Sequence, residues 1–450
     1  MTTNRRDFIK KYGIATTGII LVPTIIPACS RGKEGHVAPS DRINMAFIGA
    51  GNQAGNDARE FLKDERLQIT TICDVNKESP GYWNGKVAGR EFIKKQVDDF
   101  YSEKFGKKYK STIGVIDFRE VIQNKEIDVV EIVTPDHWHA IPVLMAAAAK
   151  KDIYCQKPLA LTIPEGRAMS NSVKKHNIIF QTGSQRRSQP KFRKLCEVVR
   201  NGRVGKLHTA TCTLPAGTPD YGRTGHLTDP TKVPKTFDYD MWLGPAPDAP
   251  YSPARTHVNY RWVLDYSGGQ LTDWGGHFND MAQWGMGTDD TGPVRIQNAR
   301  GNWVDHPVWN TANRFYFECI YANGVKLIIK SGEDTGVKFE GSEGWISNRE
   351  DPQKLMETEI GTDEIHLYKS DNHYRNFIDC VLSRKETAAP AEIGHRSITM
   401  SHLGNIAMQL EQDLDWDPES ERFLNNGAAN LMLPREMREP WASIYLELTS

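Results

Sequence analysis

The sequence predicts a doubly wound, parallel α/β sheet in its N-terminal part, followed by a second domain that combines strands with helices. Three observations carry this prediction. Short apolar runs alternate with helical segments from residue 43 onward, which is typical of a parallel sheet covered by helices. A glycine-rich turn follows the first of these runs, where such sheets bind their ligands. After residue 204 the pattern changes to successive strands separated by turns.

The length and composition suit two packed domains and exclude several classes of protein. The chain has 450 residues, 39% of them hydrophobic, and a domain usually takes roughly 100–200 residues. Its 56 basic and 57 acidic side chains nearly cancel, so no nucleic-acid partner is expected. After residue 30 no apolar run reaches the length of about 20 residues that spans a bilayer. The cysteines beyond Cys29 match no metal spacing, and we expect structural thiols or disulfides.

The first residues are typical of a targeting segment rather than of a folded domain. Residues 1–29 carry twin arginines in "NRRDFIKK" before a moderately apolar stretch, which resembles a twin-arginine (Tat) export signal. The ending "IPAC" resembles a lipoprotein processing site at Cys29, and ordinary cleavage near Ala28 is the alternative. Residues 30–42 are expected to form a linker or arm. We therefore expect export to the periplasm, with a membrane lipid anchor at Cys29 as one outcome.

The first predicted strand, residues 43–48, ends at a turn that reads "GAGNQAG" and opens a helix. Gly49, Gly51 and Ala54 fit the pattern G-x-G-x-x-A. The first glycine permits a tight turn, the second lets the backbone approach a pyrophosphate, and the small third residue lets helix and strand pack closely. The helix N-terminus then presents its amide groups to the phosphates. The alternative is a glycine turn in an α/β fold that binds no nucleotide.

The second predicted strand, "LQITTICD", ends at Asp74, about 20 residues beyond the glycines. A carboxylate at this place accepts hydrogen bonds from the adenosine ribose and repels a 2′-phosphate. The sequence therefore predicts NAD as the cofactor and disfavours NADP.

Two further predicted strands end in polar residues at the same edge of the sheet. Residues 127–135 lead into "DHWHA", and residues 152–158, "DIYCQKP", follow a helix. Residues 76–112 are long for one connection and contain a predicted polar helix. No catalytic or binding role is assigned to them. The residues predicted to bind the cofactor are Gly49, Ala50, Gly51, Asn52, Gln53, Asp74, Thr134, Pro135, His137, His139, Gln156, Lys157 and Gln185.

The second domain is expected to contain four clear strands and two amphipathic helices. The strands are "KLHTATCTLP", "RFYFECIYANG", "VKLIIKSG" and "VKFEGSEGWISN", with "ANGVK" as a hairpin turn. The helices are "HYRNFIDCVLSRK" and "RSITMSHLGNIAMQLEQ", and the tail after them packs on the body or on a neighbouring subunit. We expect a homo-oligomer, either a dimer or a tetramer.

With these motifs in this order, the chain resembles the Gfo/Idh/MocA oxidoreductases, named for glucose–fructose oxidoreductase and inositol dehydrogenase. The resemblance covers residues 43–435. It implies an NAD-binding Rossmann domain, here residues 43–160, and a substrate and oligomerisation domain, residues 161–450, built on an open, mostly antiparallel sheet with helices. Exported members occur in this family, which agrees with the N-terminal segment.

The resemblance also implies site residues. The family's Glu-Lys-Pro motif matches "QKP", so Lys157 is expected to touch both substrate and nicotinamide ribose, while Gln156 lacks the charge of the usual glutamate. An Asp and a His four apart in the second domain match Asp273 and His277. The acid and histidines of "DHWHA" also suit a metal, but the family has no catalytic metal there, so contact with nicotinamide or substrate is preferred.

Oxidation of a sugar hydroxyl needs a base for the proton and a nicotinamide for the hydride. His277 is the expected general base, because histidine titrates near neutrality. Asp273, one helical turn away, would hold the imidazole or bind a sugar hydroxyl, and Lys157 would stabilise the developing alkoxide. The alternative is an Asp–His pair that only caps a surface helix.

Further polar residues are candidates for the substrate site. Arg187 lies in "GSQRRSQPKF", where it reaches the ligand or only starts a helix. Arg255, His257 and Arg261 precede the Asp–His pair and are expected, together with that pair, to bind substrate hydroxyls. Tyr260 is a further candidate for binding substrate hydroxyls. Trp262 or Tyr266 would stack on a pyranose face, unless these aromatic residues belong to the core. Asp280 is expected either to bind substrate or to support the site.

Three functions remain open. The first is an NAD-dependent oxidoreductase acting on a secondary hydroxyl of a sugar or glycoside. The second is a redox-neutral NAD-dependent glycosidase or epimerase that oxidises a hydroxyl transiently. The third is a non-catalytic protein that binds NAD or sugar. Because free NAD is scarce outside the cytoplasm, export predicts a tightly held cofactor that is recycled on the protein.

Overall fold

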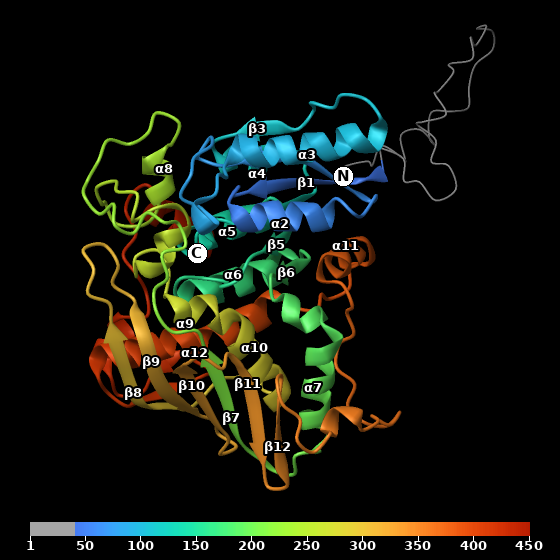
Figure 1. The fold of residues 1–450 in the computed structure, drawn as a ribbon, viewed down its shortest axis with the longest axis vertical. Coiled ribbons are helices and arrows are strands. Elements are labelled where there is room, and N and C mark those ends of the chain that lie inside the picture. The colour runs from blue at the N-terminus through green and yellow to red at the C-terminus, as the bar shows by residue number, and fades with distance from the viewer. Residues whose placement is uncertain (1–40) are drawn as a thin grey trace, which may run out of the picture. The chain divides into compact units, whose positions relative to one another are not determined.

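A six-stranded sheet forms the first part of the computed structural model, which describes residues 41–450 (Figure 1). The predicted export signal, Cys29 and nearly all of the predicted arm lie outside the described residues. The strand order is β3-β2-β1-β4-β5-β6, and all pairs are parallel. The predicted doubly wound sheet is therefore confirmed. Its strands are β1 (Ile43–Ile48), β2 (Leu67–Cys73), β3 (Ile113–Val115), β4 (Val129–Ile132), β5 (Asp152–Cys155) and β6 (Phe180–Thr182).

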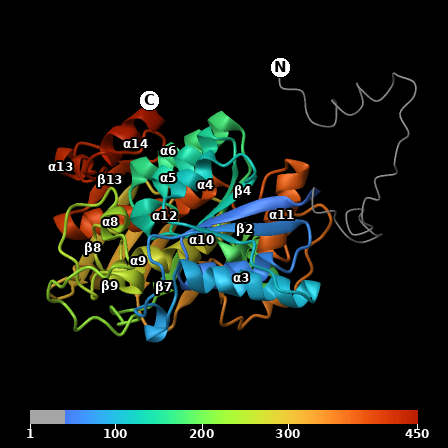
Figure 2. The same ribbon diagram turned by 90° about the horizontal axis from the view of Figure 1, so that it is seen from above.

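Helices cover both faces of this sheet because the side chains of β1 alternate between two cores. Met45 and Phe47 join one core with helices α2 and α3, whereas Ala46 and Ile48 join the other with α4 and α5. Figure 2 shows α3 on one side of the strands and α5 and α6 on the other. The helices are α2 (Asn52–Phe61), α3 (Arg90–Phe105), α4 (Phe118–Gln123), α5 (Ala140–Ala148) and α6 (Ile163–His176).

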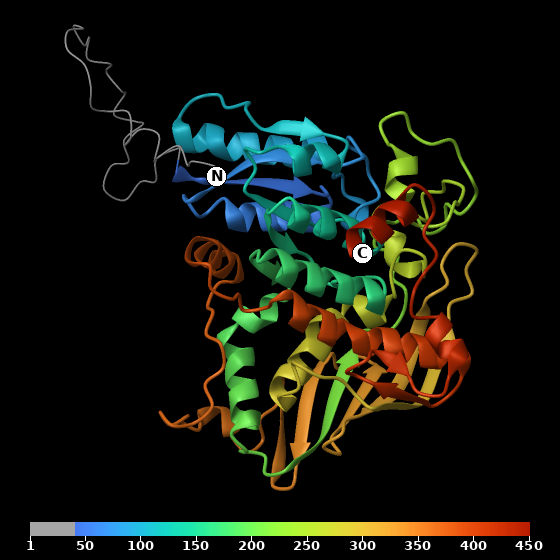
Figure 3. The same ribbon diagram turned by 180° about the vertical axis from the view of Figure 1, so that it is seen from behind.

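Two C-terminal helices also pack on the parallel sheet. Phe377 of α11 (His373–Ser383) lies in the core of α2 and α3. Helix α14 (Trp441–Thr449), red in Figure 3, contacts α5, and its first residue packs against Phe118 and Trp138. Strand β6 lies beyond residue 160, where the sequence analysis ends the Rossmann domain.

The second part is an eight-stranded sheet of order β12-β11-β7-β10-β9-β8-β13-β14. Only β7 and β10 pair in parallel among the pairs that the structure describes, so the predicted mostly antiparallel sheet is confirmed. The strands are β7 (Leu207–Leu214), β8 (Arg295–Trp303), β9 (Ala312–Ile320), β10 (Lys326–Ser331), β11 (Gly336–Gly341), β12 (Gly344–Ser347), β13 (Leu414–Asp417) and β14 (Arg422–Phe423).

Three helices bury one face of this sheet: α7 (Pro190–Arg200), α10 (Gly275–Met286) and α12 (Ala391–Leu410). Gly404 of α12 lies so close to β9 that an added Cβ would be 2.2 Å from the Phe317 ring. Ser401 of α12 donates a hydrogen bond to the Leu271 carbonyl and accepts one from Asn279. Helix α12 therefore fixes α9 (Gln270–Asp273) and α10, which carry the predicted Asp–His pair.

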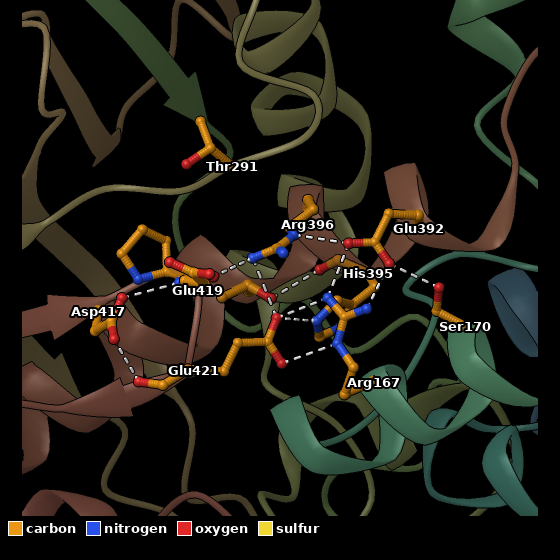
Figure 4. Close-up of polar contacts among 12 residues, drawn as sticks. Arg167, Ser170, Thr291, Glu392, His395, Arg396, Asp417, Glu419 and Glu421 are labelled. Carbon is orange, nitrogen blue, oxygen red and sulfur yellow. Dashed lines mark hydrogen bonds and ion pairs between the residues drawn. The ribbon is translucent and has the colours of Figure 1, made fainter.

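A partly buried polar cluster joins α6 to α12 and to the turn between β13 and β14 (Figure 4). Arg167 forms ion pairs of 2.6 Å with Glu392 and 2.9 Å with Glu421. His395 is fully buried, with Nε2 2.6 Å from Glu421, and Arg396 pairs with both acids. These contacts hold a helix of the parallel sheet against the second sheet's layer of helices.

The described residues carry no helix that is long and apolar enough to cross a membrane. Their six cysteines are buried free thiols.

Candidate active site

The glycine turn after β1 has a geometry that only glycine at residue 49 allows. Gly49 has φ +106°, and an added Cβ would be 2.6 Å from the Val133 carbonyl oxygen. At Gly51 a Cβ would meet nothing closer than the Tyr82 ring at 3.5 Å, so the protein itself does not demand glycine there. Gly51 caps α2 without a side-chain hydrogen bond, and the first residues of the helix, Asn52 and Gln53, line the cavity, where unpaired amide groups of a helix N-terminus are found. This cradle fits a pyrophosphate.

Asp74 follows β2 and faces the same cavity. Its Oδ2 accepts a hydrogen bond of 2.6 Å from the Ala50 amide, and its Oδ1 accepts one of 2.7 Å from the Asn76 amide. Burial raises the pKa of the Asp74 carboxyl to about 6, against the opposing effect of these amides. The carboxylate is thus fixed beside the glycine turn, as a ribose contact requires.

A single cavity of about 650 Å³ connects the glycine turn to the predicted catalytic residues. It passes the carboxyl ends of β2, β4 and β5 and reaches α9 and α10. The predicted site residues that line it are Gly49, Gly51, Asn52, Gln53, Asp74, Thr134, Pro135, Gln156, Lys157, Gln185, His257, Tyr260, Arg261, Asp273 and His277.

Lys157 and Asp273 meet across the two sheets. Nζ of Lys157 lies 2.6 Å from Oδ1 of Asp273, and Nε of Arg261 lies 3.5 Å from Oδ2. Burial favours the neutral acid, but the charges of Lys157 and then Arg261 outweigh it and hold the pKa of Asp273 well below its usual range. Asp273 is therefore ionised and positions both cations.

His277 lies in the same cavity without a hydrogen bond to Asp273. Its Nδ1 is buried and has no hydrogen-bond partner among residues 41–450. Burial, followed by the charges of Lys157 and Arg186, lowers the pKa of His277 well below its usual value. The imidazole is therefore neutral near pH 7 and free to accept a proton. The expected contact in which Asp273 holds the imidazole is absent from the described structure, because Lys157 and Arg261 take up its carboxylate.

The glycines around the Asp–His pair make room for protein groups. An added Cβ would be 2.5 Å from the Ser401 hydroxyl at Gly275 and 3.3 Å from Lys157 at Gly276. Gly269 has φ +74° and starts α9, which ends at Asp273, so the pair lies on two short helices rather than on one. The glycines thus let α12 and Lys157 approach the turn between these helices.

Several predicted ligand residues do not line the cavity. His137 lies 3.0 Å from the Trp242 carbonyl, and His139 bonds the Thr134 and Pro158 carbonyls, so both are structural histidines at 1% exposure. Arg187 is 2% exposed, because it pairs with Asp280 and Asp289 inside the second domain. Ala50, whose amide donates a hydrogen bond to Asp74, and Arg255, which donates one to the Tyr266 hydroxyl, also lie outside the lining. Of the two readings left open for Trp262 and Tyr266, the structure supports the core, because both are fully buried.

Gln156 donates a hydrogen bond to the buried carboxylate of Asp57, which explains why this position carries an amide and not the glutamate usual in the family. Its Nε2 donates to Asp57 at 2.7 Å, and Nε2 of Gln53 donates to the same carboxylate at 2.7 Å. Asp57 and Glu131 are both fully buried and adjacent, and burial raises the pKa of each. A glutamate at residue 156 would add a third carboxyl to this pair, whereas an amide supplies a donor.

Residues 76–89, to which the sequence assigned no role, form a loop over the glycine turn. Tyr82 and Trp83 line the cavity, and the Trp83 amide donates to the Asn52 side chain. The loop reaches the second domain, where His257 stacks on Tyr82 with ring centroids 4.5 Å apart and approaches Ser79 Oγ within 2.9 Å. The signal was the excess length of this connection together with the "PGYWNG" aromatics.

Comparison with known proteins agrees with this geometry. The description "Oxidoreductase family, NAD-binding Rossmann fold" matches residues 43–184, and "Oxidoreductase family, C-terminal alpha/beta domain" matches residues 192–443. The curated relatives include a myo-inositol 2-dehydrogenase of Thermotoga maritima, 36% identical over 130 residues (28% of this chain and 38% of the relative). An alpha-N-acetylgalactosaminidase of Shewanella oneidensis is 26% identical over 173 residues, which is 36% of this chain and 35% of the relative. The matches thus span little more than a third of these relatives.

Solved structures share the fold at low identity. An NAD complex of GenD2 from gentamicin A biosynthesis has a TM-score of 0.59 at 14% identity, covering 85% of this chain and 98% of the other. A scyllo-inositol dehydrogenase of Lactobacillus casei with bound NAD(H) and scyllo-inositol has a TM-score of 0.56 at 16% identity. The match covers 83% of this chain and 99% of the other. With both of its domains matched, the chain belongs to the Gfo/Idh/MocA oxidoreductase family, whose Rossmann domain binds NAD.

Proposed function

We propose that the protein is an NAD-dependent oxidoreductase that acts on a secondary hydroxyl of a sugar or glycoside. The observation that carries the proposal is the meeting of Lys157, Asp273 and His277 in one cavity with the glycine turn and Asp74. The name of the myo-inositol dehydrogenase relative supports a polyhydroxylated substrate.

The residues divide the chemistry between them. The imidazole of His277, neutral and lining the cavity, accepts the hydroxyl proton. Lys157 stabilises the developing alkoxide, and Asp273 keeps the ammonium group in place. Bound NAD supplies the hydride acceptor. Arg261, the second cation beside Asp273, is placed to bind a neighbouring hydroxyl of the substrate.

A redox-neutral glycosidase or epimerase is the second candidate. The similarity to an alpha-N-acetylgalactosaminidase over 173 residues favours it, and so does the predicted export, because a cofactor outside the cytoplasm must be recycled. A non-catalytic binding protein is disfavoured, because the lysine, the acid and the histidine are all present at the cavity. Tight cofactor retention, a periplasmic location with a lipid anchor at Cys29, and a homo-oligomeric state belong to the same proposal.

One experiment separates the candidates. The purified protein is denatured to release and identify its nucleotide, and the native protein is offered a panel of sugars and glycosides. Net reduced nicotinamide with a keto sugar supports the oxidoreductase, while cleavage or inversion without net reduction supports the redox-neutral enzyme. If the protein neither contains nor binds a dinucleotide, both enzyme proposals fail.

A further inference from the structure

The loop of residues 76–89 is fixed over the cavity by the second domain. The Lys77 amide donates to the Thr236 carbonyl at 2.9 Å, and the Asn84 amide donates to the Tyr221 carbonyl at 2.7 Å. The Val258 amide donates to the Gly81 carbonyl at 3.4 Å. Side chains on this loop therefore have set positions relative to the second domain.

Trp83 is the large aromatic side chain that this loop holds at the cavity while leaving it partly open. The residue is 40% exposed and lines the cavity. The Tyr221 ring covers one face, with ring centroids 4.0 Å apart and planes inclined by 20°. An indole held flat and partly exposed at a cavity is a surface that a ligand can cover.

Tyr221 connects this indole to the catalytic carboxylate. Burial, and after it the charge of Asp273, raises the pKa of the Tyr221 hydroxyl, which also interacts with Gln270 at the start of α9. Tyr221 thus links the Trp83 indole to α9, the helix that ends at Asp273. Trp83 lines the same cavity as Asp273 and His277, but the loop of residues 76–89 carries it, whereas these two residues lie on α9 and α10.

We propose that Trp83, backed by Tyr221, forms a subsite for the second sugar ring of a glycoside whose first ring reacts at Lys157 and His277. The apolar face of a pyranose stacks on an indole, which offers the largest flat apolar surface of any side chain. Trp262 and Tyr266, for which the sequence left open a place in the core or a stacking role, are both fully buried and do not provide this platform. The subsite rests on the proposed function and adds a preference for glycosides over free monosaccharides.

The test compares NAD-loaded wild type with Trp83→Ala and Trp83→Phe. The probes are glucose, methyl β-glucoside, cellobiose and maltose, and the readouts are dissociation constants from titration calorimetry, kcat/KM wherever nicotinamide is reduced, and bound NAD per chain. Phe105→Ala is the matched control, since Phe105 is 39% exposed and stacks on Tyr101 but does not line the cavity.

Wild type is expected to bind at least one disaccharide more tightly than the monosaccharides. Trp83→Ala should weaken that disaccharide about tenfold, leave monosaccharide binding and NAD content unchanged, and be largely rescued by Trp83→Phe. Equal weakening of both sugar classes, or loss of NAD without a change in sugar preference, would overturn the subsite while leaving the proposed function intact. If no probe binds or reacts, the subsite and the proposed function fail together.

Discussion

Nζ of Lys157 lies 2.6 Å from Oδ1 of Asp273, and this contact joins the strand end after β5 to helix α9 of the second domain. It keeps the carboxylate ionised and places a positive charge near His277, whose pKa it lowers. The pKa of His277, the proposed base, is thus lowered by burial and then by the lysine, which Asp273 holds in place.

Lys157→Met should therefore change both the rate and its pH dependence. Loss of alkoxide stabilisation should lower kcat by about 10²–10³-fold. In the folded wild type the pKa of His277 is lowered. The imidazole therefore stays neutral, and the enzyme active, below about pH 6.5, the ordinary pKa of histidine. Activity is lost only when the pH falls through the lowered pKa. Without the Lys157 charge this acid limb should move to higher pH in a profile of kcat/KM. If the acid limb of the profile did not move, the proposed effect of the Lys157 charge on the pKa of His277 would be contradicted. Lys330→Met, in strand β10, is the control and should leave the profile unchanged.

Two glycines of the nucleotide turn should respond differently to alanine. Gly49→Ala places a Cβ 2.6 Å from the Val133 carbonyl oxygen at a φ of +106°, so the free energy of unfolding should fall by about 1–3 kcal/mol. Gly51→Ala meets only the Tyr82 ring at 3.5 Å, so stability should be kept while NAD binding weakens. Chemical denaturation and NAD titration check the pair. Equal stability losses would show that Gly51 is needed for folding rather than for the ligand.

Asp74→Ser should relax the choice between NAD and NADP. The carboxylate is held by the Ala50 and Asn76 amides where it would repel a 2′-phosphate. Its removal should reduce the ratio of NAD to NADP affinity by about tenfold or more, measured by titration of cofactor-free protein. An unchanged ratio would mean that another group selects the cofactor.

Gln156→Glu should destabilise the Rossmann domain in a pH-dependent way. The new carboxyl would lie beside Asp57 and Glu131, so its folded pKa should rise above the unfolded value. The free energy of unfolding should therefore be lower than that of wild type by about 1–3 kcal/mol at pH values above the raised pKa of the new carboxyl. This difference should vanish below about pH 4.3, where the carboxyl is protonated in both states. Unfolding free energies at several pH values check this, and the double variant with Asp57→Asn should recover most of the loss. A penalty independent of pH would point to packing instead.

The parallel sheet, and the position of Lys157, Asp273 and His277 at the cavity, could be predicted because each has a local signature. A buried strand, a glycine turn and Asp74 follow one another at fixed spacing, and Lys157 is marked by the proline after it. Strand β8 was missed because "RIQNARGNW" places one fully buried residue, Ile296, among polar side chains. A half-exposed strand of this kind has no clear apolar alternation, although it pairs with β9 on one side and β13 on the other.

The assignment of aromatic and basic residues to the substrate depended on tertiary contacts that no spacing reveals. Trp262 and Arg187 have the chemistry of ligand residues, yet the first fills the core and the second is neutralised by Asp280 and Asp289. Trp83 lies in a connection with no regular pattern, and only the folded loop brings it to the cavity. Side chains of one chemical type are thus sorted into core and site by the fold.

The most direct test of the central claim is a single turnover of the NAD-loaded protein with the sugar and glycoside panel, followed by the absorbance of reduced nicotinamide. Wild type should reduce its bound cofactor, either lastingly or transiently, with at least one substrate. His277→Ala, carrying the same amount of NAD, should show no such reduction on the same time scale. Reduction at an equal rate in His277→Ala would contradict the assignment of the base. The absence of any reduction in wild type that holds NAD and binds sugar would contradict the proposed chemistry itself.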